Sequence, residues 1–395
     1  MTPNVLDVVL VLVALAYGIA GFRQGFLIGA SGLLGLLVGG FGGALLAPWL
    51  LSRVAPGLTV SVTALAVVLA CALIGQALAA HGGAKLRGYV TWRPARYVDA
   101  GVGAVLSVVA VLVVSWLLGA AVAGAHFGDL GRVVRDSKIL AAVDRFAPAV
   151  ADRAVVAFGR VVDPETFPQY LEPFTPERIL PVDPPDEAVL ATPGVEETSG
   201  SVVRVAGPAP QCGRALEGSG FVYAPERVMT NAHVVAGVAD PRVETFDGRV
   251  YSAEVVVYDP TEDVAVLAVD GLGLPALPLE EGAERGEEGA VVGYPGGGPF
   301  DAEAARIRDE QRLMGPDIYG QRDVVREVYS LYAEVRPGNS GGPLVSPDGT
   351  VWGLVFAASV EDEQTGYALT AAEVADNAEA GVDADRPVST GACAS

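Results

Sequence analysis

Four long apolar stretches make up most of the N-terminal third of the chain, and they limit the possible folds more than any other feature. They run over Val5–Phe22, Phe26–Leu51, Leu58–Ala80 and Ala100–Ala125. A helix needs about 20 mainly apolar residues to cross the hydrocarbon core of a bilayer, and each stretch is about that long. Glycines recur at helical spacing in the second stretch, which is typical of closely packed membrane helices. We therefore predict an α-helical membrane domain of four spans over residues 1–125.

Charge divides the chain at the same point. The first 125 residues have more basic than acidic side chains, whereas the whole chain has a formal net charge of −21. The remainder is therefore strongly acidic, which argues against a nucleic acid as partner because phosphate would be repelled. The loop between the third and fourth stretches contains Lys85, Arg87, Arg93 and Arg96. Basic residues gather in cytoplasmic loops, so both termini and everything after Ala125 are predicted to be extracytoplasmic.

Residues 126–198 are predicted to connect the membrane domain to a second domain. They begin with apolar residues at helical spacing, and from Asp163 to Pro193 they are dense in proline and acidic residues, which disfavours regular structure. From Ser199 the pattern changes to short β-branched segments separated by glycine, proline and aspartate. We expect residues 199–395 to form an all-β fold of two small barrels.

One serine in this β-rich part has the surroundings of a nucleophile. Ser340 lies in Gly-Asn-Ser-Gly-Gly-Pro-Leu, and a serine hydroxyl attacks when a base removes its proton. The candidate base is His233, because the other two histidines precede the β-rich part. The candidate carboxylate that orients the imidazole is Asp263, at the start of an alternating strand. Asp259 and Glu262 are rivals by residue type, but Asp259 is typical of a turn and Glu262 should face the other side of the strand.

The residues around Ser340 are also suited to bind the oxyanion that forms when a peptide bond is attacked. Gly338 can adopt backbone angles closed to other residues, so its N–H can point the same way as that of Ser340. The predicted oxyanion hole is Gly338, Asn339 and Ser340. We expect no metal and no other cofactor.

Three segments carry a resemblance to a known family. "TNAHVV", "DPTEDVAVLAV" and "RPGNSGGPLV" resemble the three catalytic blocks of trypsin-like serine proteases of the HtrA/DegP group, over residues 199–375. The resemblance implies a chymotrypsin-type double barrel and a serine endopeptidase. The four-span region, with "GFRQGF", resembles the CvpA (colicin V production) family. Together the two parts resemble the membrane-anchored periplasmic serine proteases of mycobacteria linked to acid resistance, which implies cell-envelope proteins as substrates and a role in acid or oxidative stress.

The resemblance also gives expectations about specificity and regulation. It implies a substrate pocket formed by Glu334, Phe356, Ala357, Ala358 and Tyr367. An inward Glu334 would favour basic residues of the substrate, whereas the aromatic side chains would favour small apolar ones, and both alternatives stay open. We expect no PDZ domain, because the chain ends about twenty residues after the last predicted strand. The polar insert of residues 295–323 is expected to be a mobile activation or substrate loop.

The three cysteines differ in their predicted surroundings. Cys71 lies in the third apolar stretch and is interpreted as a small apolar residue. Cys212 and Cys393 are predicted to form a disulfide, because thiols outside the cytoplasm tend to oxidise, and the mycobacterial resemblance also suggests the bond. The alternative function for the chain is a CvpA-like transport or assembly protein whose protease-like domain is a sensor or binding module.

Overall fold

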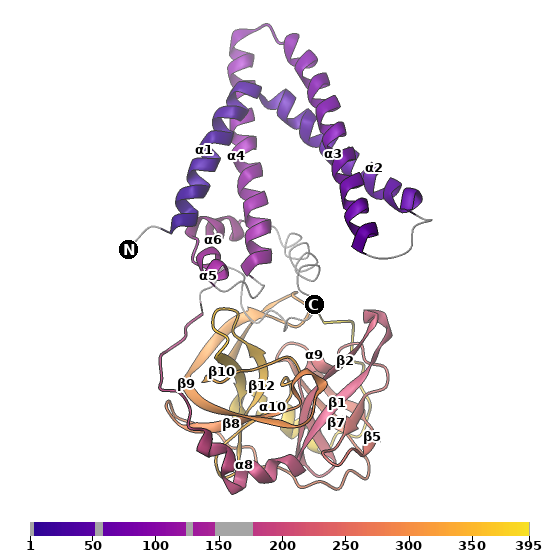
Figure 1. Cartoon of the computed structure of the whole chain (residues 1–395), viewed down its shortest axis with the longest axis vertical. Coiled ribbons are helices and arrows are strands. Elements are labelled where there is room, and N and C mark those ends of the chain that lie inside the picture. The colour runs from indigo at the N-terminus through magenta and orange to yellow at the C-terminus, as the bar shows by residue number, and fades with distance from the viewer. Residues whose placement is uncertain (1–3, 52–57, 124–128, 147–176, 395) are drawn as a thin grey trace. The chain divides into compact units, whose positions relative to one another are not determined.

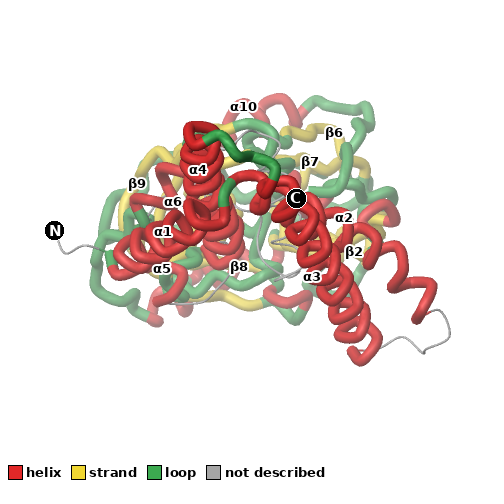
Figure 2. Tube along the Cα trace, turned by 90° about the horizontal axis from the view of Figure 1, so that it is seen from above, coloured by secondary structure: helices red, strands yellow, loops and turns green. Residues whose placement is uncertain are grey.

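The structure, a computed structural model, describes residues 4–51, 58–123, 129–146 and 177–394. It contains two compact units (Figure 1), of which the first comprises residues 1–118 and 137–145 and the second residues 119–136 and 146–395. All the strands of the described residues belong to the second unit, and Figure 2 draws strands in yellow and helices in red.

The first unit consists of helices. They are α1 (Val5–Gln24), α2 (Phe26–Leu51), α3 (Leu58–Gly88), α4 (Arg93–Ala123, whose last turn belongs to the second unit) and α6 (Lys138–Asp144). Among the described residues, three segments are long and apolar enough to cross a membrane: Val5–Gln24, Phe26–Gly43 and Arg93–Ala120. The third predicted span falls on α3, and most side chains in the first half of that helix lie outside the described residues.

Glycines bring α2 and α3 into close contact. A Cβ atom added to Gly35 would lie 2.2 Å from the carbonyl oxygen of Gly75, and one added to Gly39 would lie 2.3 Å from that of Cys71. Contact at this distance is possible only without a side chain. These two glycines of the second apolar stretch therefore pack α2 against α3 as membrane helices often pack.

The second unit begins with short helices and continues into a first sheet. The helices are α5 (Asp129–Arg135), η1 (Glu187–Ala191), α8 (Pro193–Glu197) and η2 (Thr198–Gly200). The strands are β1 (Val202–Ala209), β2 (Arg214–Ala224), β3 (Arg227–Thr230), β4 (Arg242–Glu244), β5 (Val250–Ser252), β6 (Glu254–Asp259) and β7 (Val264–Ala268). They form one antiparallel sheet in the order β5-β4-β1-β2-β3-β7-β6. The sheet encloses an apolar core that includes Val205, Val222 and Leu267.

The remaining strands close into a barrel. They are β8 (Glu288–Gly293), β9 (Asp301–Pro316), β10 (Asp323–Tyr332), β11 (Pro343–Val345), β12 (Val351–Ala358) and β13 (Thr365–Thr370), in the order β10-β13-β12-β11-β8-β9. The expected pair of barrels is thus one curled seven-stranded sheet and one closed barrel of six strands. Helix α10 (Ala371–Val382) follows and buries Val374 and Ala378.

The polar insert is not a mobile loop, and this expectation was wrong. Most of it is β9, a strand of 16 residues that pairs along its length with β8 and β10. Its many charged side chains suggested a solvated loop, but they alternate with buried Ala305 and Ile307. The barrel needs this strand to close, and pairing satisfies its backbone polar groups.

Candidate active site

His233 and Asp263 form a buried pair at one end of the first sheet. His233 lies in α9 (Ala232–Val235), directly after β3, and Asp263 lies between β6 and β7. The two side chains are joined by a hydrogen bond of 2.7 Å between Nδ1 of His233 and Oδ2 of Asp263. The other carboxylate oxygen accepts the backbone N–H of His233 at 2.9 Å. The side chains are 11% and 4% exposed, so the imidazole is oriented by a carboxylate largely shielded from water.

The local sequence explains why Asp263 rather than a neighbour meets His233. Asp259 accepts the N–H groups of Thr261 and Glu262, so it forms the turn after β6. Asp263 has a φ of 64°, a left-handed conformation that aspartate tolerates better than most residues. The Asn231 side chain holds it there by donating to its carbonyl oxygen at 2.9 Å.

Ser340 lies on the segment between β10 and β11 and is 4% exposed. Its carbonyl oxygen accepts the backbone N–H of Ser219 in β2 at 2.7 Å. A Cβ atom on Gly218 would lie 2.9 Å from that carbonyl oxygen and 2.7 Å from Val234, the residue after His233. The fold therefore brings the Ser340 segment against the first sheet beside α9. In the described part of the chain, no hydrogen bond joins the Ser340 hydroxyl to His233.

Both peptide groups that flank Gly338 are held by hydrogen bonds. The carbonyl of Pro337 accepts the N–H of Gly296 at 2.6 Å, and the carbonyl of Gly338 accepts the hydroxyl of Ser219 at 2.7 Å. Because N–H and C=O point in opposite directions in a trans peptide, the N–H of Gly338 points away from Gly296. Gly338 has a φ of 97°, which glycine adopts without strain.

The backbone donors near Ser340 differ in availability. Among the described residues, the N–H groups of Gly338 and Ser340 donate to no other atom. The N–H of Asn339 donates to the carbonyl of Arg336 at 2.9 Å, so Asn339 is not available as an oxyanion donor. Of the three residues predicted to form the oxyanion hole, Asn339 therefore has its N–H engaged in a turn over residues 336–339.

Ser219 belongs to this arrangement, although the sequence analysis did not identify it. It is fully buried, and its hydroxyl accepts the N–H of Tyr294 at 2.9 Å while donating to Gly338. Ser219 thereby links β2 of the first sheet to the segments after β8 and before Ser340. The available signal was the pair of glycines on either side of it, because glycine inside a strand often marks close approach of another backbone.

The predicted pocket residues differ in burial. Phe356, Ala357 and Ala358 of β12 are buried. Tyr367 of β13 is also buried, and its hydroxyl donates to the carboxylate of Glu177 at 2.8 Å. Glu334, in contrast, is exposed.

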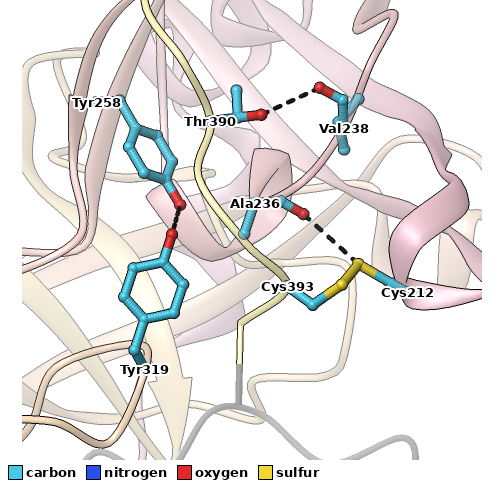
Figure 3. The surroundings of a disulfide bond; sticks show 7 residues. All are labelled: Cys212, Ala236, Val238, Tyr258, Tyr319, Thr390 and Cys393. Atoms are coloured by element: carbon cyan, nitrogen blue, oxygen red, sulfur yellow. Dashed lines mark hydrogen bonds between the residues drawn. A yellow bond between two sulfur atoms is a disulfide. The ribbon is translucent and has the colours of Figure 1, made fainter.

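A disulfide between Cys212 and Cys393 ties the C-terminal tail to the first sheet (Figure 3), with 5.6 Å between the two Cα atoms. Thr390 in the tail forms two further hydrogen bonds. Its carbonyl accepts the N–H of Gly237, and its hydroxyl donates to the carbonyl of Val238. The tail therefore packs on the segment that follows α9, the helix of His233.

Both parts of the chain are similar to known families. A family model of trypsin-like peptidase domains matches residues 218–354, and one of colicin V production proteins matches residues 6–148. The serine protease Rv3671c of Mycobacterium tuberculosis is 41% identical over 399 residues, which cover 100% of both chains. A probable periplasmic serine endoprotease, DegP-like, of Halomonas elongata is 39% identical over 35% of this chain and 28% of that protein.

A solved structure agrees with these sequence matches. The crystal structure of the active form of the Rv3671c protease is 50% identical and covers 57% of this chain and 99% of that chain, with a TM-score of 0.54. The second unit therefore has the chymotrypsin-like β fold of that protease. With a relative at 41% identity over its full length, the chain belongs to the family of trypsin-like serine proteases with a colicin V production domain that includes Rv3671c.

Proposed function

We propose that this serine protease is a membrane-tethered endopeptidase that cleaves extracytoplasmic proteins of the cell envelope through His233, Asp263 and Ser340, in the response to acid or oxidative stress. The observation that carries the proposal is the buried hydrogen bond between His233 and Asp263, close to the Ser340 segment. Such a pair has the chemistry of a general base, and a binding module would have no need of it.

The proposed reaction proceeds through an acyl-enzyme. His233 takes the proton of the Ser340 hydroxyl as the oxygen attacks the substrate carbonyl, and Asp263 stabilises the resulting imidazolium. The N–H groups of Gly338 and Ser340 bind the oxyanion, and one such donor contributes about 2.7–4 kcal/mol to transition-state stabilisation. The proton then passes from His233 to the leaving amine, and water hydrolyses the acyl-enzyme by the same steps.

The proposed pocket favours small apolar side chains of the substrate. Phe356, Ala357, Ala358 and Tyr367 would form its wall, and all four are buried. The exposure of Glu334 argues against a negative charge at the pocket floor, because a charge in contact with water is screened and selects weakly.

Replacement of Ser340 tests the proposed function. The purified full chain in detergent micelles is expected to cleave casein, and the Ser340→Ala variant is expected to lose that activity. Ser199→Ala, which changes a half-buried serine whose hydroxyl donates to the carbonyl of Glu196, is the control and should keep it. Equal cleavage by Ser340→Ala and the unchanged protein would remove the proposal.

The proposed arrangement in the membrane has four spans within residues 1–125, a connector over 126–198 and the protease domain over 199–395, with both termini outside the cytoplasm. Cysteine labelling in intact cells tests it in a Cys71→Ala background. A cysteine at Gly82, where no atom lies within 4 Å of an added Cβ, should resist an impermeant maleimide. One at the exposed Asp183 should react. The opposite pattern would place the protease domain in the cytoplasm.

We assign the spans an anchoring role rather than transport. The two acidic residues of the first 125 residues are both engaged in contacts of the first unit. Asp99 pairs with Arg87 at 2.8 Å and accepts the N–H of Leu27, and Asp7 accepts the hydroxyl of Ser137. Acidic residues held in this way have no need of a transported ion, so the contacts of these two residues favour anchoring over ion transport.

A further inference from the structure

The turn that follows the pocket strand is held by residues that precede the β domain. This turn, Ser359–Gln364, joins β12 to β13 and begins directly after Ala358 of the proposed pocket. Within the turn, the hydroxyl of Ser359 accepts the N–H groups of Glu361 and Asp362, both at 3.0 Å. Val360 and Glu361, in the first half of the turn, form hydrogen bonds with two residues far earlier in the chain.

Arg135, the last residue of α5, is the first of these. It is 3% exposed, and its guanidinium donates to the Glu361 carboxylate at 3.0 Å and to the Val360 carbonyl at 3.2 Å. It also donates to the carbonyl of Ala123. A buried guanidinium is costly unless it is paired and fully hydrogen-bonded, and here the turn supplies the pairing charge.

Glu177 is the second. One of its carboxylate oxygens accepts the backbone N–H of Val360 at 3.0 Å, and the other accepts the hydroxyl of Tyr367 at 2.8 Å. Its own N–H donates to Glu361 at 3.3 Å. Burial, followed by the nearby Glu177 charge, raises the pKa of Tyr367, so this hydroxyl stays protonated and keeps donating.

A buried arginine of β9 also joins the turn to the connector (residues 126–198). Arg308 donates to the carbonyl of Leu180 at 3.1 Å and to that of Gln364 at 3.3 Å, and it pairs with Asp362 at 3.3 Å. Its guanidinium also lies over the ring of Tyr332, 4.4 Å from the centroid. The end of the turn is therefore held to the connector as well.

We propose that Arg135 and Glu177 are positioning residues for proteolysis, which set the turn after β12 and thereby the wall of the substrate pocket. Arg135 and Glu177 bind the C=O and the N–H of the same residue, Val360, and Glu177 also binds the pocket residue Tyr367. Peptide cleavage thus depends on a segment outside the β domain. The inference rests on the proposed function, because it assumes that β12 and β13 bind substrate.

The test compares peptide cleavage with a reaction that does not use the pocket. The variants are Glu177→Gln and Arg135→Gln in the full chain, in detergent micelles. For each, kcat/KM on a peptide of at least four residues is measured beside the rate of Ser340 acylation by a small active ester. We expect kcat/KM to fall about tenfold, mainly through a higher KM, because a buried hydrogen bond to a charged group is lost. The rate with the small ester is expected to stay unchanged.

The control is Arg178→Gln, which removes the exposed neighbour of Glu177 that pairs with Asp309. It should match the unchanged protein in both reactions. Unchanged peptide kinetics in Glu177→Gln and Arg135→Gln would overturn the inference, and so would an equal loss in both reactions, which indicates a role in folding alone. If the unchanged protein cleaves no peptide and acylates no ester, the proposed function itself fails.

Discussion

At the scale of single residues, the hydroxyl of Ser219 connects the two sheets beside Ser340. It is fully buried and joins the N–H of Tyr294 to the carbonyl of Gly338. The sequence patterns around His233, Asp263 and Ser340 single these residues out because their chemistry depends on residue type. Ser219, in contrast, binds backbone groups of Tyr294 and Gly338, which lie far away in the sequence, so no local pattern indicates its role.

This role gives a prediction for Ser219→Ala. The change removes the donor to the Gly338 carbonyl, so the peptide group that follows Gly338 loses this hydrogen bond, and the backbone of Gly338, whose own N–H is proposed to bind the oxyanion, is held less firmly. We expect kcat on a peptide substrate to fall by roughly 10- to 100-fold with KM nearly unchanged, because the loss affects the transition state more than substrate binding. Steady-state kinetics measure both constants.

The matched control is Ser330→Ala, another fully buried serine, whose hydroxyl has no partner in the described structure. It should keep the kcat of the unchanged protein. A Ser219→Ala protein with the same kcat as this control would show that Gly338 does not need the hydroxyl.

At the scale of elements, the short apolar strands of the β domain were predictable, because alternation and turn residues mark them locally. β9 and α10 were not predicted. The charged residues of β9 are accommodated by partners distant in the sequence, as Arg308 shows with Leu180 and Asp362. The acidic helix α10 has few apolar residues, so no helical apolar pattern marks it. It is stabilised by Thr370, which caps its first turn, and by Val374, which packs in the core.

The contact of α10 with the Asp263 loop gives a prediction that depends on pH. Burial, and after it a hydrogen bond with Glu373 of α10, raises the pKa of Glu262 to about 8. The unfolded chain releases this proton near pH 4.3. Unfolding therefore releases a proton between about pH 4.5 and 8, and the stability that the protonated Glu262 contributes is lost as the pH rises through this window. Asp259 adds to the shift and Arg326 opposes it.

Glu262→Gln should remove this dependence, because glutamine stays neutral. We expect its Tm to exceed that of the unchanged protein at pH 8 and to equal it near pH 4.5. The exposed Glu254→Gln is the control, for which no such difference is expected. Thermal unfolding at several pH values measures the gap, and a gap that stays constant with pH would contradict the account.

At the scale of the whole molecule, the division into an apolar helical part and an acidic β-rich part was predictable from composition alone. The contacts between the segment before the β domain and the turn after β12 were not, because they join residues more than 180 positions apart. The same is true of the tail that returns to the first sheet. Such contacts depend on the completed fold.

The tail gives a prediction about stability. The disulfide joins residues 181 positions apart, and closing so long a loop contributes roughly 5 kcal/mol in the chain-entropy model. Cys393→Ser is therefore expected to lower Tm, and reduction of the unchanged protein is expected to lower it equally. Cys71→Ala, which breaks no bond, serves as control. If Cys393→Ser and Cys71→Ala have the same Tm, the disulfide contributes nothing to stability.

The central claim is that Ser340 is a nucleophile activated by His233. A fluorophosphonate reacts covalently with serine only where a base activates it, so mass spectrometry of the treated full chain tests the claim directly. The account predicts one adduct per chain, on the peptide that contains Ser340, and its loss in a folded His233→Ala variant. An unmodified Ser340 under conditions that label a reference serine protease would contradict the account, and so would an adduct that persists in His233→Ala.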